Sequence, residues 1–234
     1  MTSNIVIAGV GKGIGSSLAY YLNSKDYNLF LISRGKNVEN VAKDINCNFY
    51  HADFNAYSQC NNAMEAAEKD LGTIDAVVNV AGNYYSNQSI ENTEPENFEE
   101  ALLNNARSFY NIAKSSVSAM KKNKHGSIIG FSAASNVYLN SNPGYSAGKG
   151  AVYFMVKSLA RELIHYNIRV NGIAPGFIGH DMSNDSAIPE LGTLTPFPTL
   201  GINQTVEFLI NNEMITGEII PVSGGHDINL KSGI

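Results

Sequence analysis

The chain has 234 residues and a formal net charge of −5, from 16 basic and 21 acidic residues. This length suits one α/β domain with a large core, so we expect residues 1–234 to form a single domain. The charges are spread along the chain, which argues against a nucleic-acid partner and against membrane association. A small molecule is the partner that this composition favours.

The N-terminus and the cysteines indicate a cytoplasmic protein. Residues 1–15 lack the charged start and long apolar core of a signal peptide, and no apolar run is long enough to span a bilayer. Cys47 and Cys60 are the only cysteines, with no CxxC and no nearby histidine pair. We therefore expect free thiols, no disulfide framework and no metal site.

Short apolar runs rich in β-branched residues alternate with longer amphipathic segments. Such near-continuous runs are typical of parallel strands that helices cover on both faces. The pattern predicts an α/β single-domain Rossmann fold, a doubly wound parallel sheet of about seven strands flanked by helices. The expected strands are 4–8, 28–33, 48–51, 74–79, 127–131, 168–174 and 217–222, and the expected helices are 13–24, 37–46, 56–71, 96–122, 144–165 and 203–212.

A glycine-rich turn, AGVGKGIG at 8–15, joins the first strand to the first helix. Glycine allows a tight turn and a close approach of the backbone to a pyrophosphate, which meets the free N–H groups of the helix start. Glycine-rich turns also occur for packing reasons, and this spacing is not G-x-G-x-x-G. The turn residues that we expect to bind a dinucleotide are Gly9, Gly11, Lys12, Gly13, Ile14 and Gly15.

The end of the second strand indicates which dinucleotide binds. An NAD-preferring Rossmann unit places an acid there against the ribose 2′-hydroxyl, but this chain has Ser33 and Arg34. Arg34 can pair with a 2′-phosphate, Ser33 can hydrogen-bond to it, and Lys12 supplies a second cation. The alternative is that both cations are ordinary solvated charges. We expect a preference for NADP(H), with NAD(H) also possible.

Tyr145 and Lys149 are four residues apart in an expected helix, so their side chains share one face. A nearby ammonium and an oxidised nicotinamide would favour the phenolate and lower the tyrosine pKa towards working pH. The phenol could then exchange a proton with a carbonyl oxygen, and a serine at a neighbouring strand end could hold that oxygen. A packed ring beside a solvated charge is the simpler alternative.

The least regular stretch, at about 177–202, follows a strand at the edge that should bind the ligand. A long loop in a compact domain is usually functional, and we expect a short substrate lid. Its apolar residues either face a partly apolar substrate or pack the lid onto the domain. These residues are Ile188, Leu191, Leu194, Phe197 and Leu200.

Seven motifs in order resemble those of the short-chain dehydrogenase/reductase family, in its compact single-domain branch. AGVGKGIG resembles T-G-x-x-x-G-x-G, NVAG (79–82) resembles N-N-A-G, and YSAGK (145–149) resembles Y-x-x-x-K. The resemblance extends over about residues 4–228. The other matching segments are HADF (51–54), LLNNARSFYNIA (102–113), IRVNGIAPGFI (168–178) and ITGEIIPVSGG (215–225).

The resemblance implies roles for these residues. Tyr145 would be the acid/base, Lys149 would bind the nicotinamide ribose, and Asn105 would position a relay water. A serine near 132 would orient the carbonyl group. The resemblance also implies a homodimer or homotetramer built through helices 96–122 and 144–165. Further cofactor contacts are implied for Asp53, Asn79, Ala81, Gly82, Pro175, Gly176 and Ile178.

Three residues depart from the family pattern. Ala8 replaces a threonine of the glycine turn, and Val80 replaces the second asparagine of N-N-A-G. We expect altered local hydrogen bonds at both positions without loss of binding. His180 replaces a threonine that commonly contacts the carboxamide of the cofactor. The histidine would weaken cofactor binding, make the same contact through its ring, or face solvent.

The SAAS stretch at 132–135 offers two candidates for the catalytic serine. Counting back thirteen residues from Tyr145 reaches Ser132. The family's strand count, in contrast, places Ala133 where its members usually have the second, catalytic serine. We give more weight to the spacing from Tyr145, because the serine hydroxyl and the phenol must meet at one carbonyl oxygen. The strand upstream can accommodate one missing residue. We therefore predict Ser132, with Ser135 as the fallback.

The expected function is hydride transfer between NADP(H) and a carbonyl or secondary alcohol substrate. One alternative is a 3-oxoacyl-[acyl-carrier-protein] reductase, although no basic cluster by the lid singles out an acidic carrier protein. A protein that senses NADP(H) without catalysis is an alternative of another class. The presence of Tyr145, Lys149 and Asn105 argues against a sensor, because a sensor needs none of them.

Overall fold

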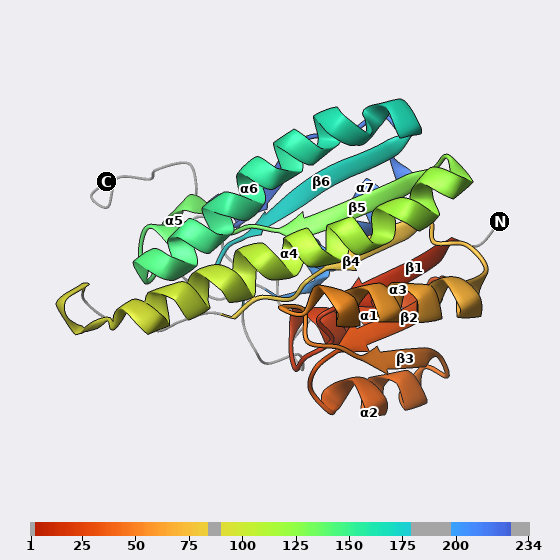
Figure 1. The fold of residues 1–234 in the computed structure, drawn as a ribbon, viewed down its shortest axis with the longest axis horizontal. Coiled ribbons are helices and arrows are strands. Elements are labelled where there is room, and N and C mark those ends of the chain that lie inside the picture. Colours follow the sequence, from red (N-terminus) through yellow and green to blue (C-terminus); the bar gives the residue numbers. More distant parts are fainter. Residues whose placement is uncertain (1–2, 84–89, 179–197, 226–234) are drawn as a thin grey trace.

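A computed structural model describes residues 3–83, 90–178 and 198–225 (Figure 1). Its seven strands form one parallel sheet in the order β3-β2-β1-β4-β5-β6-β7. The α/β doubly wound fold predicted from the sequence is confirmed. The strands are β1 (Asn4–Ala8), β2 (Asn28–Ser33), β3 (Asn48–His51), β4 (Ala76–Asn79), β5 (Gly126–Phe131), β6 (Ile168–Pro175) and β7 (Ile219–Val222).

Every expected helix is present, with ends that differ by a few residues. Two of the helix starts show ordinary start signals: α4 begins at Pro95, and Asn142 caps α6 by accepting a hydrogen bond from the Gly144 N–H at 2.8 Å. The helices are α1 (Ile14–Asn23), α2 (Asn37–Asp44), α3 (Tyr57–Leu71), α4 (Pro95–Asn123), α5 (Ser135–Tyr138), α6 (Pro143–Leu163) and α7 (Leu200–Asn211), with 3₁₀ turns η1 (Ile90–Asn92) and η2 (Ile164–Tyr166).

Two strand starts and one additional helix correct the sequence prediction. Strands β4 and β7 start at Ala76 and Ile219, later than expected. Just before β4, the Asp75 carboxylate accepts a hydrogen bond from the Asn4 N–H at 2.8 Å. Helix α5 is not among the expected helices, because four residues are too few to show helical periodicity.

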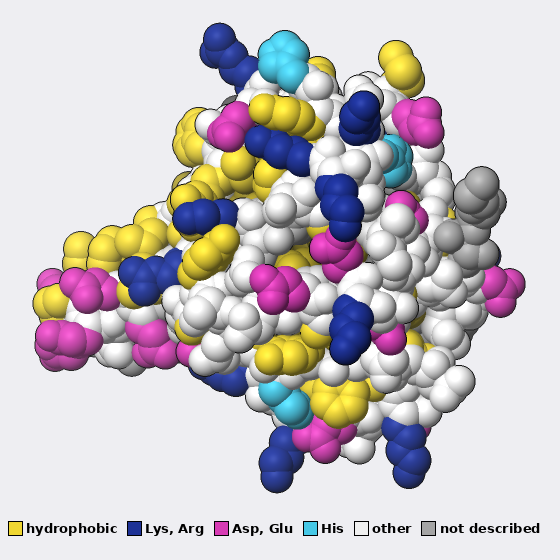
Figure 2. Space-filling view, turned by 45° about the vertical axis from the view of Figure 1, so that its right-hand side comes forward, with side chains coloured by type: hydrophobic (Ala, Val, Ile, Leu, Met, Phe, Trp, Pro, Cys, Tyr) yellow, Lys and Arg dark blue, Asp and Glu magenta, His cyan; other side chains and the backbone are white. Residues whose placement is uncertain are grey.

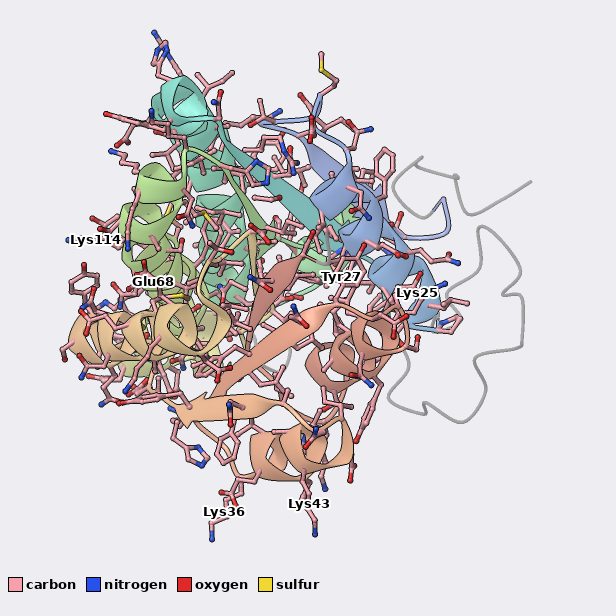
Figure 3. All side chains as sticks on the ribbon, turned by 90° about the vertical axis from the view of Figure 1, so that its right-hand side faces the viewer. Lys25, Tyr27, Lys36, Lys43, Glu68 and Lys114 are labelled. Carbon is pink, nitrogen blue, oxygen red and sulfur yellow. The ribbon has the colours of Figure 1, made fainter. Side chains whose placement is uncertain are left out.

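The strands are apolar on both faces because helices cover both sides of the sheet. On β1, Val6 packs with residues of α3, α4 and α6, whereas Ile5 and Ile7 pack with residues of α1, α2 and α7. Figure 3 shows these two helical layers on either side of the sheet. Burial on both faces explains the near-continuous apolar runs in the sequence.

Strand β1 lies between β2 and β4, so the chain winds away from β1 in both directions. In open α/β sheets this switch point creates a crevice at the carboxyl ends of the strands. Residues 179–197 lie outside the described part, and with them most of the expected lid and His180. Within the described ranges, every helix is too short or too polar to cross a bilayer.

Candidate functional site

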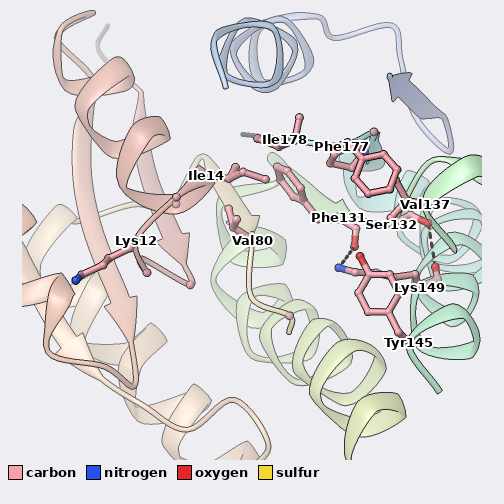
Figure 4. Close-up of a pocket in the computed structure, with 17 residues that line it drawn as sticks. Lys12, Ile14, Val80, Phe131, Ser132, Val137, Tyr145, Lys149, Phe177 and Ile178 are labelled. Atoms are coloured by element: carbon pink, nitrogen blue, oxygen red, sulfur yellow. Dashed lines mark hydrogen bonds between the residues drawn. The ribbon is translucent and has the colours of Figure 1, made fainter. Parts of the chain in front are cut away.

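A cavity of about 470 Å³ opens at the carboxyl ends of β1, β4, β5 and β6 (Figure 4). It brings together the glycine turn and three of the four predicted catalytic residues, and Lys12 and Tyr145 lie at its opposite ends. The lining residues that the sequence predicted are Gly9, Gly11, Lys12, Gly13, Ile14, Gly15, Gly82, Ser132, Tyr145, Lys149, Pro175, Gly176 and Ile178.

Close backbone contacts shape the glycine turn. Gly9 has a φ of 104°, and a Cβ there would lie 2.5 Å from the Ala81 nitrogen. A Cβ on Gly15 would lie 2.2 Å from the Gly9 carbonyl oxygen. Both positions therefore require glycine, and the turn presents bare backbone to the cavity beside the first N–H groups of α1. This arrangement fits a pyrophosphate.

The two small departures from the family pattern lie next to each other in the fold. The Ala8 carbonyl accepts hydrogen bonds from the Val80 N–H at 2.8 Å and from the Ala81 N–H at 3.2 Å. The Gly9 N–H donates to the Ile32 carbonyl at 2.8 Å. Backbone hydrogen bonds thus brace the turn where a threonine hydroxyl is lacking.

Ser132 directly follows the end of β5. Strands β5 and β6 pair in unbroken register, from Gly126 opposite Ile168 to Phe131 opposite Ile173. Ser132 lines the cavity, whereas Ser135 opens α5 and is not among the cavity's lining residues. Of the two serines in SAAS, Ser132 is therefore the one that the fold places beside Tyr145.

Two hydrogen bonds join Lys149 to the end of β5. The Lys149 ammonium donates to the Phe131 carbonyl at 2.9 Å, and the Ser132 hydroxyl donates to the Lys149 carbonyl at 2.9 Å. Lys149 Nζ also lies 5.7 Å from the centre of the Tyr145 ring. Burial lowers the pKa of Lys149 to about 8, because the apolar surroundings disfavour the charged form. A buried cation therefore lies against the phenol (Figure 4).

Asn105 approaches this group from α4. Its Nδ2 donates to the Ala101 carbonyl at 2.8 Å and to the Asn83 carbonyl at 3.2 Å, while its Oδ1 is buried without a partner among the described residues. A Cβ on Gly82 would lie 2.5 Å from that Oδ1 and 3.0 Å from Lys149 Nζ. Asn105 does not line the cavity, but its unpaired acceptor and the ammonium face the same point.

A second hollow, of about 70 Å³, lies beside the end of β2 and contains Arg34 and Asp53. Gly82 borders both hollows, so they are neighbours. Ser33 is buried, and its carbonyl accepts a hydrogen bond from the Ala52 N–H at 3.3 Å. Ser33, Asn79 and Ala81 line neither hollow. The remaining lining residues are Phe54, Asn55, Asn83, Asn104 and Ser108.

Sequence reasoning missed three apolar residues of the cavity wall. Phe131 and Phe177 directly adjoin predicted site residues at strand ends, and that position was an available signal. Val137 lies on α5, where the sequence gives no such signal. With these side chains the wall next to Ser132 and Tyr145 is largely apolar (Figure 4).

The comparisons with known proteins agree with this geometry. A model of the short chain dehydrogenase family matches residues 3–190. Carbonyl reductase family member 4 of Xenopus laevis is 30% identical over 239 residues, covering 98% of this chain and 100% of the relative. The 3-oxoacyl-[acyl-carrier-protein] reductase FabG of Staphylococcus aureus is 30% identical over 244 residues, covering 96% of this chain and 98% of the relative.

A solved structure, ElxO with NADP bound, has a TM-score of 0.84 at 27% identity, covering 97% of this chain and 99% of that one. The chain belongs to the short-chain dehydrogenase family.

Proposed function

We propose that this chain is an NADP(H)-dependent oxidoreductase acting on a carbonyl or secondary alcohol. One observation carries the proposal: a single cavity has the glycine turn at one end and Ser132, Tyr145 and Lys149 at the other. A dinucleotide held at the turn would extend towards the phenol. The similarity to ElxO with NADP bound supports this cofactor class.

The chain offers a place for each part of the dinucleotide. The glycine turn and the start of α1 would hold the pyrophosphate, and the smaller hollow with Asp53 would hold the adenosine end. Gly176 and Ile178 would meet the nicotinamide end. When bound, the nicotinamide supplies or accepts the hydride.

The protein's own groups would handle the proton. In reduction, Tyr145 gives its phenolic proton to the carbonyl oxygen. The Ser132 hydroxyl turns from the Lys149 carbonyl and donates its one hydrogen bond to the same substrate oxygen. Lys149 stabilises the phenolate that remains, because its ammonium lies against the ring. Asn105 Oδ1 would hold a water beside Lys149 through which the tyrosine recovers a proton.

The charges near the end of β2 support NADP(H) over NAD(H). Arg34 is exposed beside the smaller hollow and Lys12 is exposed at the glycine turn, so both can reach a 2′-phosphate. No acidic residue occupies the end of β2, the place of the acid that selects a free 2′-hydroxyl.

A 3-oxoacyl thioester is the second candidate substrate. The similarity to the 3-oxoacyl-[acyl-carrier-protein] reductase of Staphylococcus aureus favours it. The apolar wall formed by Phe131, Val137 and Phe177 suits an acyl chain as well as a simple ketone.

We further infer a cytoplasmic homodimer or homotetramer. Cys47 and Cys60 are both free thiols, as expected in a reducing compartment. Figure 2 shows hydrophobic side chains interleaved with Lys and Arg over α4 and α6. Phe154 on α6 is 72% exposed and Tyr110 on α4 is 48% exposed, which supports an interface there.

The test is NADPH oxidation with a panel of ketones, diketones and acetoacetyl thioesters, repeated with NADH. We expect turnover with NADPH and a higher kcat/KM than with NADH. The Tyr145→Phe variant should bind NADPH normally and lose activity by about 10²–10⁴-fold, the usual contribution of a general acid. NADPH binding without oxidation across the panel would favour a sensor instead.

A further inference from the structure

Two hydrogen bonds in series join the start of α2 to the glycine turn. Asn37, the first residue of α2, donates from Nδ2 to the Ser16 hydroxyl of α1 at 2.9 Å. The Ser16 hydroxyl donates in turn to the Gly11 carbonyl at 2.5 Å. Ser16 is buried and Asn37 is partly buried, so water competes only weakly for these two bonds. We call them the Asn37–Ser16 link.

The chemistry of the three groups fixes the direction of the link. A carbonyl oxygen can only accept, so the single hydroxyl proton of Ser16 goes to Gly11. The hydroxyl oxygen then offers only lone pairs to Asn37, which must present its NH₂ group and not its own carbonyl oxygen. Loss of the donor at position 37 or at position 16 therefore breaks the link.

The link ends beside the two cations that would meet a 2′-phosphate. Lys12 directly follows Gly11, and Arg34 precedes Asn37 by three residues. Both cations have a glycine neighbour with open surroundings, since a Cβ on Gly11 or on Gly35 would meet nothing within 4 Å. Packing does little to fix these two segments, and glycine leaves the backbone free to change conformation. The hydrogen bonds of the link restrict both segments.

We propose that Asn37 and Ser16 are positioning residues for binding of the 2′-phosphate of the cofactor. The inference rests on the proposed NADP(H) function. By holding the Gly11 carbonyl, the link limits the positions that Lys12 can take, and it restrains the segment of Arg34 at the start of α2. Less conformational freedom is then lost when the phosphate binds, so the affinity is higher. Neither Asn37 nor Ser16 lines a hollow, so both act through the cations.

The test is calorimetric binding of 2′,5′-ADP and of 5′-AMP at about pH 7.5, where the 2′-phosphate is mostly dianionic. The two ligands differ only in this phosphate, so the ratio of their affinities measures its contribution. Asn37→Ala and Ser16→Ala should each lower the ratio by up to about fivefold, the upper end for an exposed charge contact. Binding of 5′-AMP shows in each case that the variant is folded.

A double-mutant cycle tests whether Asn37 acts through Lys12. Lys12→Ala should lower the ratio by itself. In the Lys12→Ala background, Asn37→Ala should change the ratio less than it does in the wild type, because the cation that it positions is gone. An equal change in both backgrounds would mean that Asn37 acts independently of Lys12, and it would overturn the proposal.

Each variant has a matched control. Asn40→Ala removes an exposed asparagine from the same helix as Asn37. Ser17→Ala removes a buried hydroxyl next to Ser16, but this hydroxyl lies 2.6 Å from the Thr199 hydroxyl and accepts from Asn203 Nδ2 at 2.8 Å, away from the glycine turn. Both controls should keep the wild-type ratio, even if Ser17→Ala lowers the stability of the fold.

Wild-type ratios in both Asn37→Ala and Ser16→Ala would overturn the positioning role and leave the NADP(H) preference standing. A wild type that binds 2′,5′-ADP no better than 5′-AMP would overturn the NADP(H) preference itself, and the positioning role with it.

Discussion

Burial of the Lys149 side chain disfavours its charged form. Burial lowers its pKa to about 8 from the ordinary 10.5, so the unfolded chain binds this proton more tightly than the folded one. Below pH 8 the folded protein bears the full cost of the buried ammonium, and this cost disappears as the pH rises towards 10.5. This burial costs stability, and in the function that we propose the charge serves the neighbouring phenol and the cofactor.

The first prediction concerns this titration. NADPH affinity and kcat/KM for ketone reduction should fall as the pH rises through about 8, because Lys149 then loses its charge. Lys149→Arg keeps a charge that does not titrate, so its NADPH affinity should stay level over that range. Fluorescence titration of NADPH measures this even if the variant turns over slowly. The same fall in the arginine variant would assign the titration to another group.

The second prediction decides between the two serines. Ser132→Ala should lower kcat by about 10²–10³-fold, as expected when one donor to a developing oxyanion is removed. Ser135→Ala, at the start of α5, should leave kcat within about threefold of the wild type, because only Ser132 lines the cavity. Steady-state kinetics of both variants measure the difference. The reverse order would place the substrate oxygen against α5.

At the scale of the elements, the IRVNG segment of β6 (168–172) acts in the fold and not at the cavity. Arg169 of β6 is buried, and its guanidinium donates to the Leu209 carbonyl at 2.7 Å and to the Ile210 carbonyl at 2.8 Å. Both carbonyls belong to the last turn of α7, where a cation is favourable. Asn171 likewise donates to the Ile215 carbonyl at 2.8 Å and accepts from the Glu218 N–H at 3.0 Å. These two side chains attach α7 and β7 to the sheet.

The third prediction follows from this attachment. Arg169→Leu should lower the free energy of unfolding by about 2–4 kcal/mol, because two buried carbonyls lose charged donors. Urea unfolding measures the change. Arg161→Leu on the exposed face of α6 is the control and should stay within about 0.5 kcal/mol of the wild type. Equal stability of the two variants would show that water replaces the guanidinium.

The elements also show what the sequence could predict. The strands were predictable because both faces of the sheet are covered, which leaves runs such as NIVIA at β1. Helix α5 was not, because Ser135–Tyr138 has no period and is ordered by its surroundings. The cavity residues at strand ends followed from the parallel topology, whereas Val137 reaches the cavity wall through its packing with Ala133, Ala134 and Tyr145. Such contacts leave no pattern in one sequence.

At the scale of the whole molecule, the small residues of α6 divide into two groups. Gly148 faces inwards, since a Cβ there would lie 2.8 Å from the Asn105 Cβ of α4. A Cβ on Gly150, in contrast, would have no neighbouring heavy atom within 4 Å. Close packing of α6 on α4 thus uses Gly148, whereas Gly150 and Phe154 lie on an outer side of α6 that does not pack on α4.

The last prediction tests whether a second copy covers that outer side. Phe154 is 72% exposed, and its neighbour Tyr153 is 41% exposed, so a monomer would leave a large apolar area in water. Phe154→Asp would bury a carboxylate in the interface and should lower the mass measured by light scattering to a smaller assembly at micromolar concentration. Met214→Asp is the control. Met214 is 91% exposed and lies between α7 and β7, outside α4 and α6, so the mass of this variant should equal that of the wild type. A Phe154→Asp protein of unchanged mass would exclude this face of α6 as the interface and would leave its aromatic side chains to contact solvent or another partner.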